Sequence, residues 1–130
     1  MRSTTEVITI LKSHRQTCAK IMILENALRE MGAGLKNRGA AEENLTRLVH
    51  LRNGAESWLS LLNREERFLI QTHLIDGLDW AKTIVEHEKM WGVANGRSER
   101  TLKRIQAKAI EKIVACLNQL EAVLKEEEVD

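Results

Sequence analysis

The segment RSERTLKRIQAKAIEK, residues 97–112, combines a helix start, a basic face and an apolar stripe. Ser98 is suited to cap the free backbone N–H groups of a first helical turn, so we expect a helix to begin there. Apolar residues then recur every three or four positions, which places them on one side of that helix. They are Leu102, Ile105, Ala109, Ile113, Cys116 and Leu120. The pattern predicts an amphipathic helix that runs to about Leu124.

The other side of this helix is basic. Residues 97–112 contain six Lys or Arg and two Glu, a local charge of +4, whereas the whole chain carries only +1. Arg100 and Arg104 fall opposite the apolar stripe, and three lysines flank them, at Lys103, Lys108 and Lys112. Such a helix can bury one side and offer the other to the major groove of duplex DNA, where arginine pairs with guanine. A charged face that meets only solvent is the alternative.

Composition limits the fold and the classes of function. The 130 residues suit one compact domain, or a small domain with a helical extension, and they include no proline. Helical spacing recurs along the chain and no segment alternates as a strand would, so we predict an all-α fold. Three Trp, one Phe and no Tyr disfavour a stacking platform for single-stranded nucleic acid. No apolar run approaches the roughly 18 residues of a membrane span, so we expect no membrane partner.

The first sixty residues predict a long antiparallel helical hairpin. Residues 4–31 form one three-four apolar pattern close to heptads, and residues 41–61 form a second. Gly32, Gly34 and Gly39 mark the connection between the two helices. A hairpin of this size has too little material to close its own core. We expect it to form a homodimer with a second copy, to cover the C-terminal domain, or to pack on another protein.

Two shorter helices are predicted between the hairpin and the basic helix. Asn63 is a suitable cap for the first, and acidic residues follow it in the first turn. Asp76-Gly77 ends that helix, and Asp79 can cap the next one. Residues 92–96 predict a loop before Ser98. The domain organisation we expect is therefore a helical hairpin at 1–61, a helix-turn-helix domain at 62–124 and an acidic tail at 125–130.

Residues 62–113 carry a resemblance to a known family. Its three blocks are LNREER at 62–67, LIDGLDW at 74–80 and SERTLKRIQAKAIEKI at 98–113. They resemble region four of bacterial sigma factors, and are more closely similar to the phage-encoded ArpU/RinA-like transcriptional regulators. Members of that family join a helical N-terminal part to a sigma-like helix-turn-helix. The chain departs from the family between Trp80 and Ser98, where roughly two extra helical turns imply either an extended helix or a bulging loop.

The resemblance implies a sequence-specific duplex-DNA-binding transcriptional regulator of a phage or prophage, with no cofactor, acting in the cytoplasm of a bacterial host. It implies that Ser98 starts the recognition helix, that Leu102, Ile105 and Ala109 are buried, and that Trp80 is a packing residue. Candidate DNA-binding residues, from the basic face and the resemblance together, are Arg97, Ser98, Glu99, Arg100, Thr101, Lys103, Arg104, Lys108 and Lys82. Contacts to about five phosphates would give log affinity a slope of about −4 to −5 against log salt.

Two other functions stay open: a small terminase subunit that marks viral DNA for packaging, and an RNA polymerase-binding adaptor that does not read DNA. An enzyme is not expected, because the four histidines lack metal-ligand spacing and no nucleophile-base set can be named. We expect His14 to be a packing residue and His87 to lie at the surface. Cys18 and Cys116 are expected to be buried free thiols in a reducing cytosol, because no secretory signal is recognisable.

Overall fold

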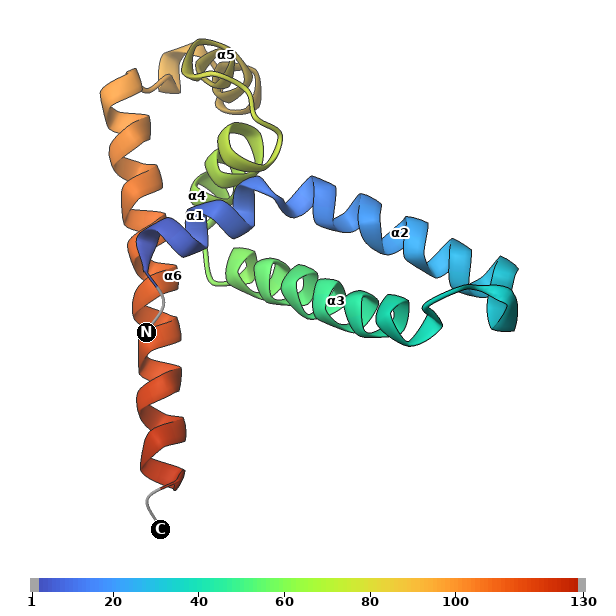
Figure 1. Ribbon diagram of the computed structural model, residues 1–130. Coiled ribbons are helices and arrows are strands. Elements are labelled where there is room, and N and C mark those ends of the chain that lie inside the picture. Colours follow the sequence, from blue (N-terminus) through green and yellow to red (C-terminus); the bar gives the residue numbers. More distant parts are fainter. Residues whose placement is uncertain (1–2, 129–130) are drawn as a thin grey trace.

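Figure 1 shows the computed structural model of the chain, which is built from helices. The structure describes residues 3–128, and within them it contains six α-helices and no strand. The helices are α1 Thr4–Lys12, α2 His14–Met31, α3 Arg38–Ser60, α4 Arg64–Leu69, α5 Trp80–Trp91 and α6 Glu99–Glu128. Short 3-10 turns lie at Gly32–Gly34 and Val93–Asn95, and a π-helical segment, η2 Ile70–Ile75, continues α4. The prediction of an all-α fold is confirmed.

The helices form a compact centre from which two parts project (Figure 1). The hairpin of α2 and α3 points to one side, and the two helices pack along each other. Helix α6 runs past the centre, and its C-terminal half extends well beyond α1. Among residues 3–128, no helix is both long and apolar enough to cross a membrane.

The expected single helix over residues 4–31 is wrong, because it breaks at Ser13. The Ser13 hydroxyl donates to the Thr9 carbonyl at 2.8 Å, and the Ser13 backbone N–H donates to the same oxygen at 3.1 Å. Ser13 itself has φ −87° and ψ −4°, away from regular helical values, so α1 ends there. The break allows α1 to pack on α6 and η2, while α2 continues along α3.

One hydrophobic core joins the N-terminal and C-terminal parts of the chain. It takes side chains from α1, from the end of α3, from η2 and from the middle of α6. Its buried members are Val7, Leu11, Ala55, Trp58, Leu62, Ile70, Leu74, Ile75, Ala109, Ile110 and Ile113. The core therefore crosses residue 61, where the sequence suggested a domain boundary, and α1 forms part of the support for α6.

The apolar stripe of α6 is buried only in its first half. Leu102, Ala109 and Ile113 are buried as expected, and Ile105 is half-buried. Cys116 and Leu120 are exposed, so the expectation of a buried Cys116 is wrong. The reason is that the packed centre ends before this part of the helix (Figure 1). Helix α6 also continues to Glu128, into the expected acidic tail, whose last two residues lie outside the described range.

Candidate nucleic-acid interface

Ser98 caps the N-terminus of α6. The Ser98 hydroxyl oxygen accepts the Thr101 backbone N–H at 3.2 Å and donates to the Thr101 hydroxyl at 2.9 Å. Capping of this kind satisfies a backbone donor that the first turn would otherwise leave free. The predicted helix start is thus confirmed. The Ser98 and Thr101 side chains are both engaged in this cap, so we expect them to position the helix instead of contacting DNA themselves.

A row of cations lies along the outer face of α6. Arg100, Arg104 and Lys108 are exposed, and each is one turn from the next, opposite the buried Leu102 and Ala109. Among the side chains that the structure describes, none forms an ion pair or a hydrogen bond with the side chains of these three residues. At 1.5 Å per residue the row spans about 12 Å. We refer to these three residues as the free basic row.

The remaining cations of this segment are paired with acids. Lys103 Nζ lies 3.9 Å from Glu99 Oε2, and both side chains are about half exposed, so water screens this pair. Lys112 Nζ lies 2.7 Å from Glu66 Oε1, and Glu66 is buried. The Glu66 carboxylate also accepts the Asn63 backbone N–H at 3.0 Å, which completes a capping box at the start of α4. Lys112 therefore fastens α6 to α4.

Arg97 is held by Glu65, from the first turn of α4. Arg97 Nε donates to Glu65 Oε2 at 3.0 Å, and the same oxygen lies 2.8 Å from His87 Nε2 on α5. A carboxylate only accepts, so Nε2 is the nitrogen that carries the hydrogen. Burial raises the pKa of Glu65, but hydrogen bonds from Arg97 and His87 outweigh it and hold that pKa below its ordinary value. This carboxylate joins α4, α5 and the segment that leads into α6.

His87 was expected at the surface, and this expectation is wrong. Its side chain is only 1% exposed, stacked on Trp91 with ring centroids 4.6 Å apart and packed edge-on to Phe68. Its Nδ1 is buried without a hydrogen-bond partner. Burial follows from the apolar face of α5, on which His87 lies one turn from both Trp91 and the fully buried Thr83.

The connection between α5 and α6 is longer than a tight turn. Helix α5 extends to Trp91, and a 3-10 turn follows before Ser98, so the extra residues form both a longer helix and a structured loop. Gly92 ends α5 with φ +88° and ψ 152°, a conformation nearly restricted to glycine. The Asn95 side-chain amide donates to the Trp91 carbonyl at 2.9 Å. The loop thus has a defined course into α6.

Lys82 is not brought together with the free basic row. It lies in the first turn of α5, where Asp79 accepts its backbone N–H at 2.8 Å, and its side chain is exposed. The shallow depression that it lines is formed by α5 and Leu78, with no contribution from α6. Trp80 stacks on His73 at 3.8 Å, so its expected packing role is confirmed. His73 Nδ1 in turn lies 2.8 Å from Gln106 Oε1 of α6.

No group of three or more His, Cys, Asp or Glu that could hold a metal ion is found among the side chains that the structure describes. The half-buried Cys18 is a free thiol, as is Cys116. Cys18 Sγ lies 3.7 Å from His14 Nε2, one turn away on α2.

Sequence reasoning missed the contacts of Glu65, Glu66 and His87. The acids were recognised only as suitable residues for a first helical turn, and their partners lie 22 to 46 positions away. The available signal was the apolar spacing of α5, which places His87 with Trp91 and Thr83.

A comparison with family models, curated proteins and solved structures found no match to this chain. The function is therefore proposed from the geometry of the chain, together with the resemblance noted in its sequence.

Proposed function

We propose that the protein is a sequence-specific duplex-DNA-binding transcriptional regulator that reads the major groove with the first half of α6. The observation that carries the proposal is the free basic row. Three exposed cations without acidic partners follow one face of a helix whose other face is anchored in the core. A helix with its side chains is about 10–12 Å in diameter and fits the major groove, which is about 12 Å wide.

The contacts around this face suit a rigid reading helix. Glu65 holds Arg97 immediately before the cap, and Glu66 holds Lys112 after the free basic row. The helix is thus fixed to α4 at both ends of the face. Side chains on a fixed helix lose less freedom when they bind, which favours bidentate pairing of Arg100 and Arg104 with guanine. Lys108, and Lys103 once released from its screened pair, would contact phosphates.

The resemblance of residues 62–113 to sigma region four and to the ArpU/RinA-like regulators supports the same proposal, including a phage or prophage origin and a bacterial cytoplasmic setting. The family uses the positions of Glu99, Arg100, Lys103 and Arg104 on promoter bases and phosphates. In this chain Glu99 and Lys103 face each other across one turn. DNA would therefore compete with Glu99 for the Lys103 ammonium group.

Arg97 and Lys112 are already paired with Glu65 and Glu66, which lowers the number of cations available to phosphate groups. On a mixed duplex pool, where Arg100 and Arg104 meet phosphates instead of a preferred guanine, four cations remain: Arg100, Lys103, Arg104 and Lys108. Four phosphate contacts give log affinity a slope of about −3.6 against log salt, less steep than the slope for five contacts. The measurement is fluorescence anisotropy of a labelled duplex pool, titrated with the protein at several salt concentrations. The double variant R100A/R104A should reduce this slope by about 2.

A matched control removes two cations from α2 instead. R15A/K20A lowers the net charge by the same amount, at exposed positions on the hairpin. Its slope should equal that of the unmodified protein. Affinity that does not respond to salt, or equal losses in both double variants, would refute the assignment of this face. If no duplex binds at moderate salt, a pull-down with RNA polymerase tests the adaptor function. If duplex DNA does bind, a ring of eight or more copies in solution would indicate a packaging protein.

A further inference from the structure

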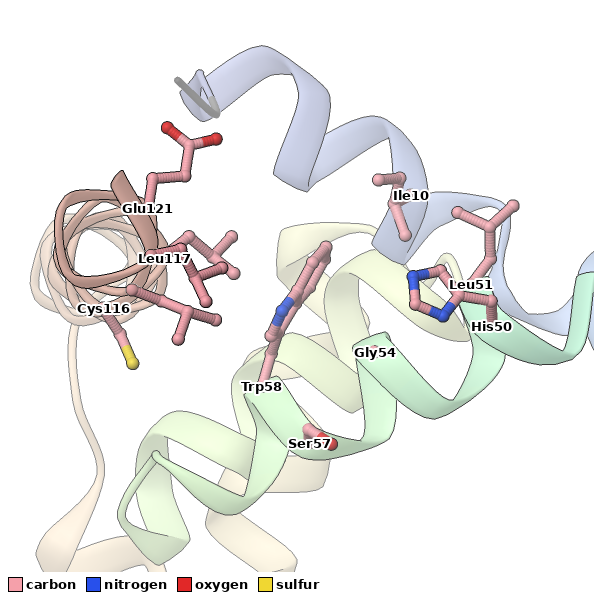
Figure 2. Close-up of a pocket in the computed structure, with 11 residues that line it drawn as sticks. Ile10, His50, Leu51, Gly54, Ser57, Trp58, Cys116, Leu117 and Glu121 are labelled. Carbon is pink, nitrogen blue, oxygen red and sulfur yellow. The ribbon is translucent and has the colours of Figure 1, made fainter. Parts of the chain in front are cut away.

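An open apolar groove lies between α3 and the C-terminal half of α6 (Figure 2). Its volume is about 440 Å³. Trp58 of α3 and Leu117 of α6 face each other across it, and Ile10 of α1 closes one side. Gly54 leaves the wall of α3 without a side chain, and a Cβ atom added there would meet nothing within 4 Å. The groove has the shape to receive aliphatic side chains.

Three aliphatic side chains of this surface are partly exposed to solvent, and two of them, Leu120 and Leu124, also line the groove. Leu120, Val123 and Leu124 are each about half exposed. Leu120 and Leu124 continue a heptad spacing whose earlier members are Ile110, Ile113 and Leu117. The first two of these are buried in the core of the chain itself, and Leu117 is half-buried. The seam therefore begins in the core and continues along the groove, where Leu120 and Leu124 remain half exposed.

We propose that a second copy of the chain covers this surface, so that α6 of each copy inserts Leu120 and Leu124 into the groove of its partner. An isologous dimer needs one patch that carries both the projecting groups and the cavity that receives them. This surface carries both. Few charges oppose the pairing: residues 113–124 contain a single charged side chain, Glu121, which lines the groove, whereas residues 97–112 contain eight charged side chains.

The size of the surface sets the expected strength of the dimer. Eleven residues line the groove, and a standard interface uses about twenty to thirty on each side. We therefore expect a dissociation constant in the micromolar range, with dimers that form as concentration rises. The groove lies at the end of α6 away from the free basic row, so this proposal does not depend on DNA binding.

The test is sedimentation velocity of the full chain at roughly 1 to 200 μM, with the monomer mass of 14.8 kDa as reference. The unmodified protein should shift from one to two copies over this range. L120K/L124K should raise the dissociation constant at least tenfold. The control M22K/I23K adds the same charges at exposed apolar positions of α2 and should leave the dimer intact.

A second variant distinguishes loss of the dimer from loss of the fold. G54L fills the groove from its open wall and keeps the helix, so it should dissociate the dimer while the far-ultraviolet circular dichroism stays unchanged. A protein that remains monomeric at 200 μM, or a dimer that persists in both L120K/L124K and G54L, would overturn the proposal. A dimer lost only in M22K/I23K would place the interface on α2 instead. R100A/R104A should remain dimeric, which separates this result from the test of DNA binding.

Discussion

At the scale of single residues, Glu65 determines how the start of α6 is held. One of its carboxylate oxygens meets both Arg97 and His87, at 3.0 and 2.8 Å. Its side chain is 23% exposed, so these contacts are partly shielded from water and salt. A partly shielded carboxylate with two donors contributes more to folding than an exposed surface pair.

We predict that E65Q lowers the free energy of unfolding at pH 7 by about 1 to 2 kcal/mol, because a neutral amide accepts more weakly from Arg97 and His87. The pKa of Glu65 lies below its ordinary value of 4.5. An acid with a lowered pKa stabilises the fold above its unfolded pKa, and this contribution is lost as the pH falls through the folded pKa. The difference between the two proteins should therefore shrink as the pH falls below 4.5, as measured by urea unfolding at a series of pH values.

The control for this prediction is E86Q. Glu86 pairs with Lys89 one turn away on α5, and both side chains are substantially exposed. Its substitution should change stability by less than about 0.5 kcal/mol at any pH. A loss in E65Q that persists unchanged at pH 3 would contradict the role given to the Glu65 charge.

Residue contacts divide into those that the sequence could predict and those that it could not. The caps formed by Asn63, Asp79 and Ser98 were predictable, because each joins residues only three positions apart. The Glu65 contact to Arg97 spans 32 positions. It depends on how α4 packs beside the loop, which no local pattern encodes. For the same reason, two of the six cations in residues 97–112 could not be recognised as already paired.

At the scale of elements, Gly92 favours the end of α5, whereas Gly54 weakens the interior of α3. Gly92 adopts φ +88° at the end of α5, whereas Gly54 lies inside α3 with open space around it. Alanine at position 92 would be forced into a backbone conformation that residues with a Cβ atom rarely adopt. Alanine at position 54 would instead favour the helix.

We predict that G92A lowers the unfolding free energy by about 1 to 3 kcal/mol, and that G54A raises it by up to about 1 kcal/mol. The measurement is urea unfolding followed by circular dichroism, with each variant compared to the unmodified protein. A gain in stability for G92A would mean that α5 does not end in the conformation described, and the defined course of the loop into α6 would be lost with it.

Helix positions were largely predictable, but helix breaks were not. The spacing of apolar residues predicted the hairpin, the two short helices and the basic helix, because that spacing repeats over several turns. The break at Ser13 has no proline or glycine to mark it, and it lies where the chain leaves α1, whose Val7 and Leu11 are buried in the core shared with α6. Periodicity continues across such a break, so the pattern suggested one helix instead of α1 and α2.

At the scale of the whole molecule, α1 connects the hairpin to the support of α6. Val7 and Leu11 are fully buried in the core that also contains Ile110 and Ile113. The sequence could not predict this, since a short amphipathic helix fits equally well on its own hairpin or on another element. Burial along the second half of α6 was wrongly expected for a similar reason: an apolar stripe does not show where its covering surface ends.

We predict that L11A lowers the unfolding free energy by about 2 to 5 kcal/mol and that the chain still unfolds in one transition. The reason is that a cavity at Leu11 would weaken contacts to both α6 and the end of α3. Circular dichroism and tryptophan fluorescence should report the same midpoint. The control M22A removes an exposed side chain from α2 and should have little effect. Two separate transitions would show that the hairpin and the C-terminal part fold independently.

The most direct test of the proposed function is selection of random duplex DNA by the purified protein, with R100A/R104A and R15A/K20A selected in parallel. We predict that the unmodified protein and R15A/K20A enrich the same motif, and that R100A/R104A loses it, by roughly 1 to 3 kcal/mol of base preference for each arginine that pairs with guanine. Two copies of the motif at a fixed spacing would further indicate binding as a symmetric dimer. Equal enrichment by all three proteins, or none by any of them, would contradict the assignment of sequence reading to α6.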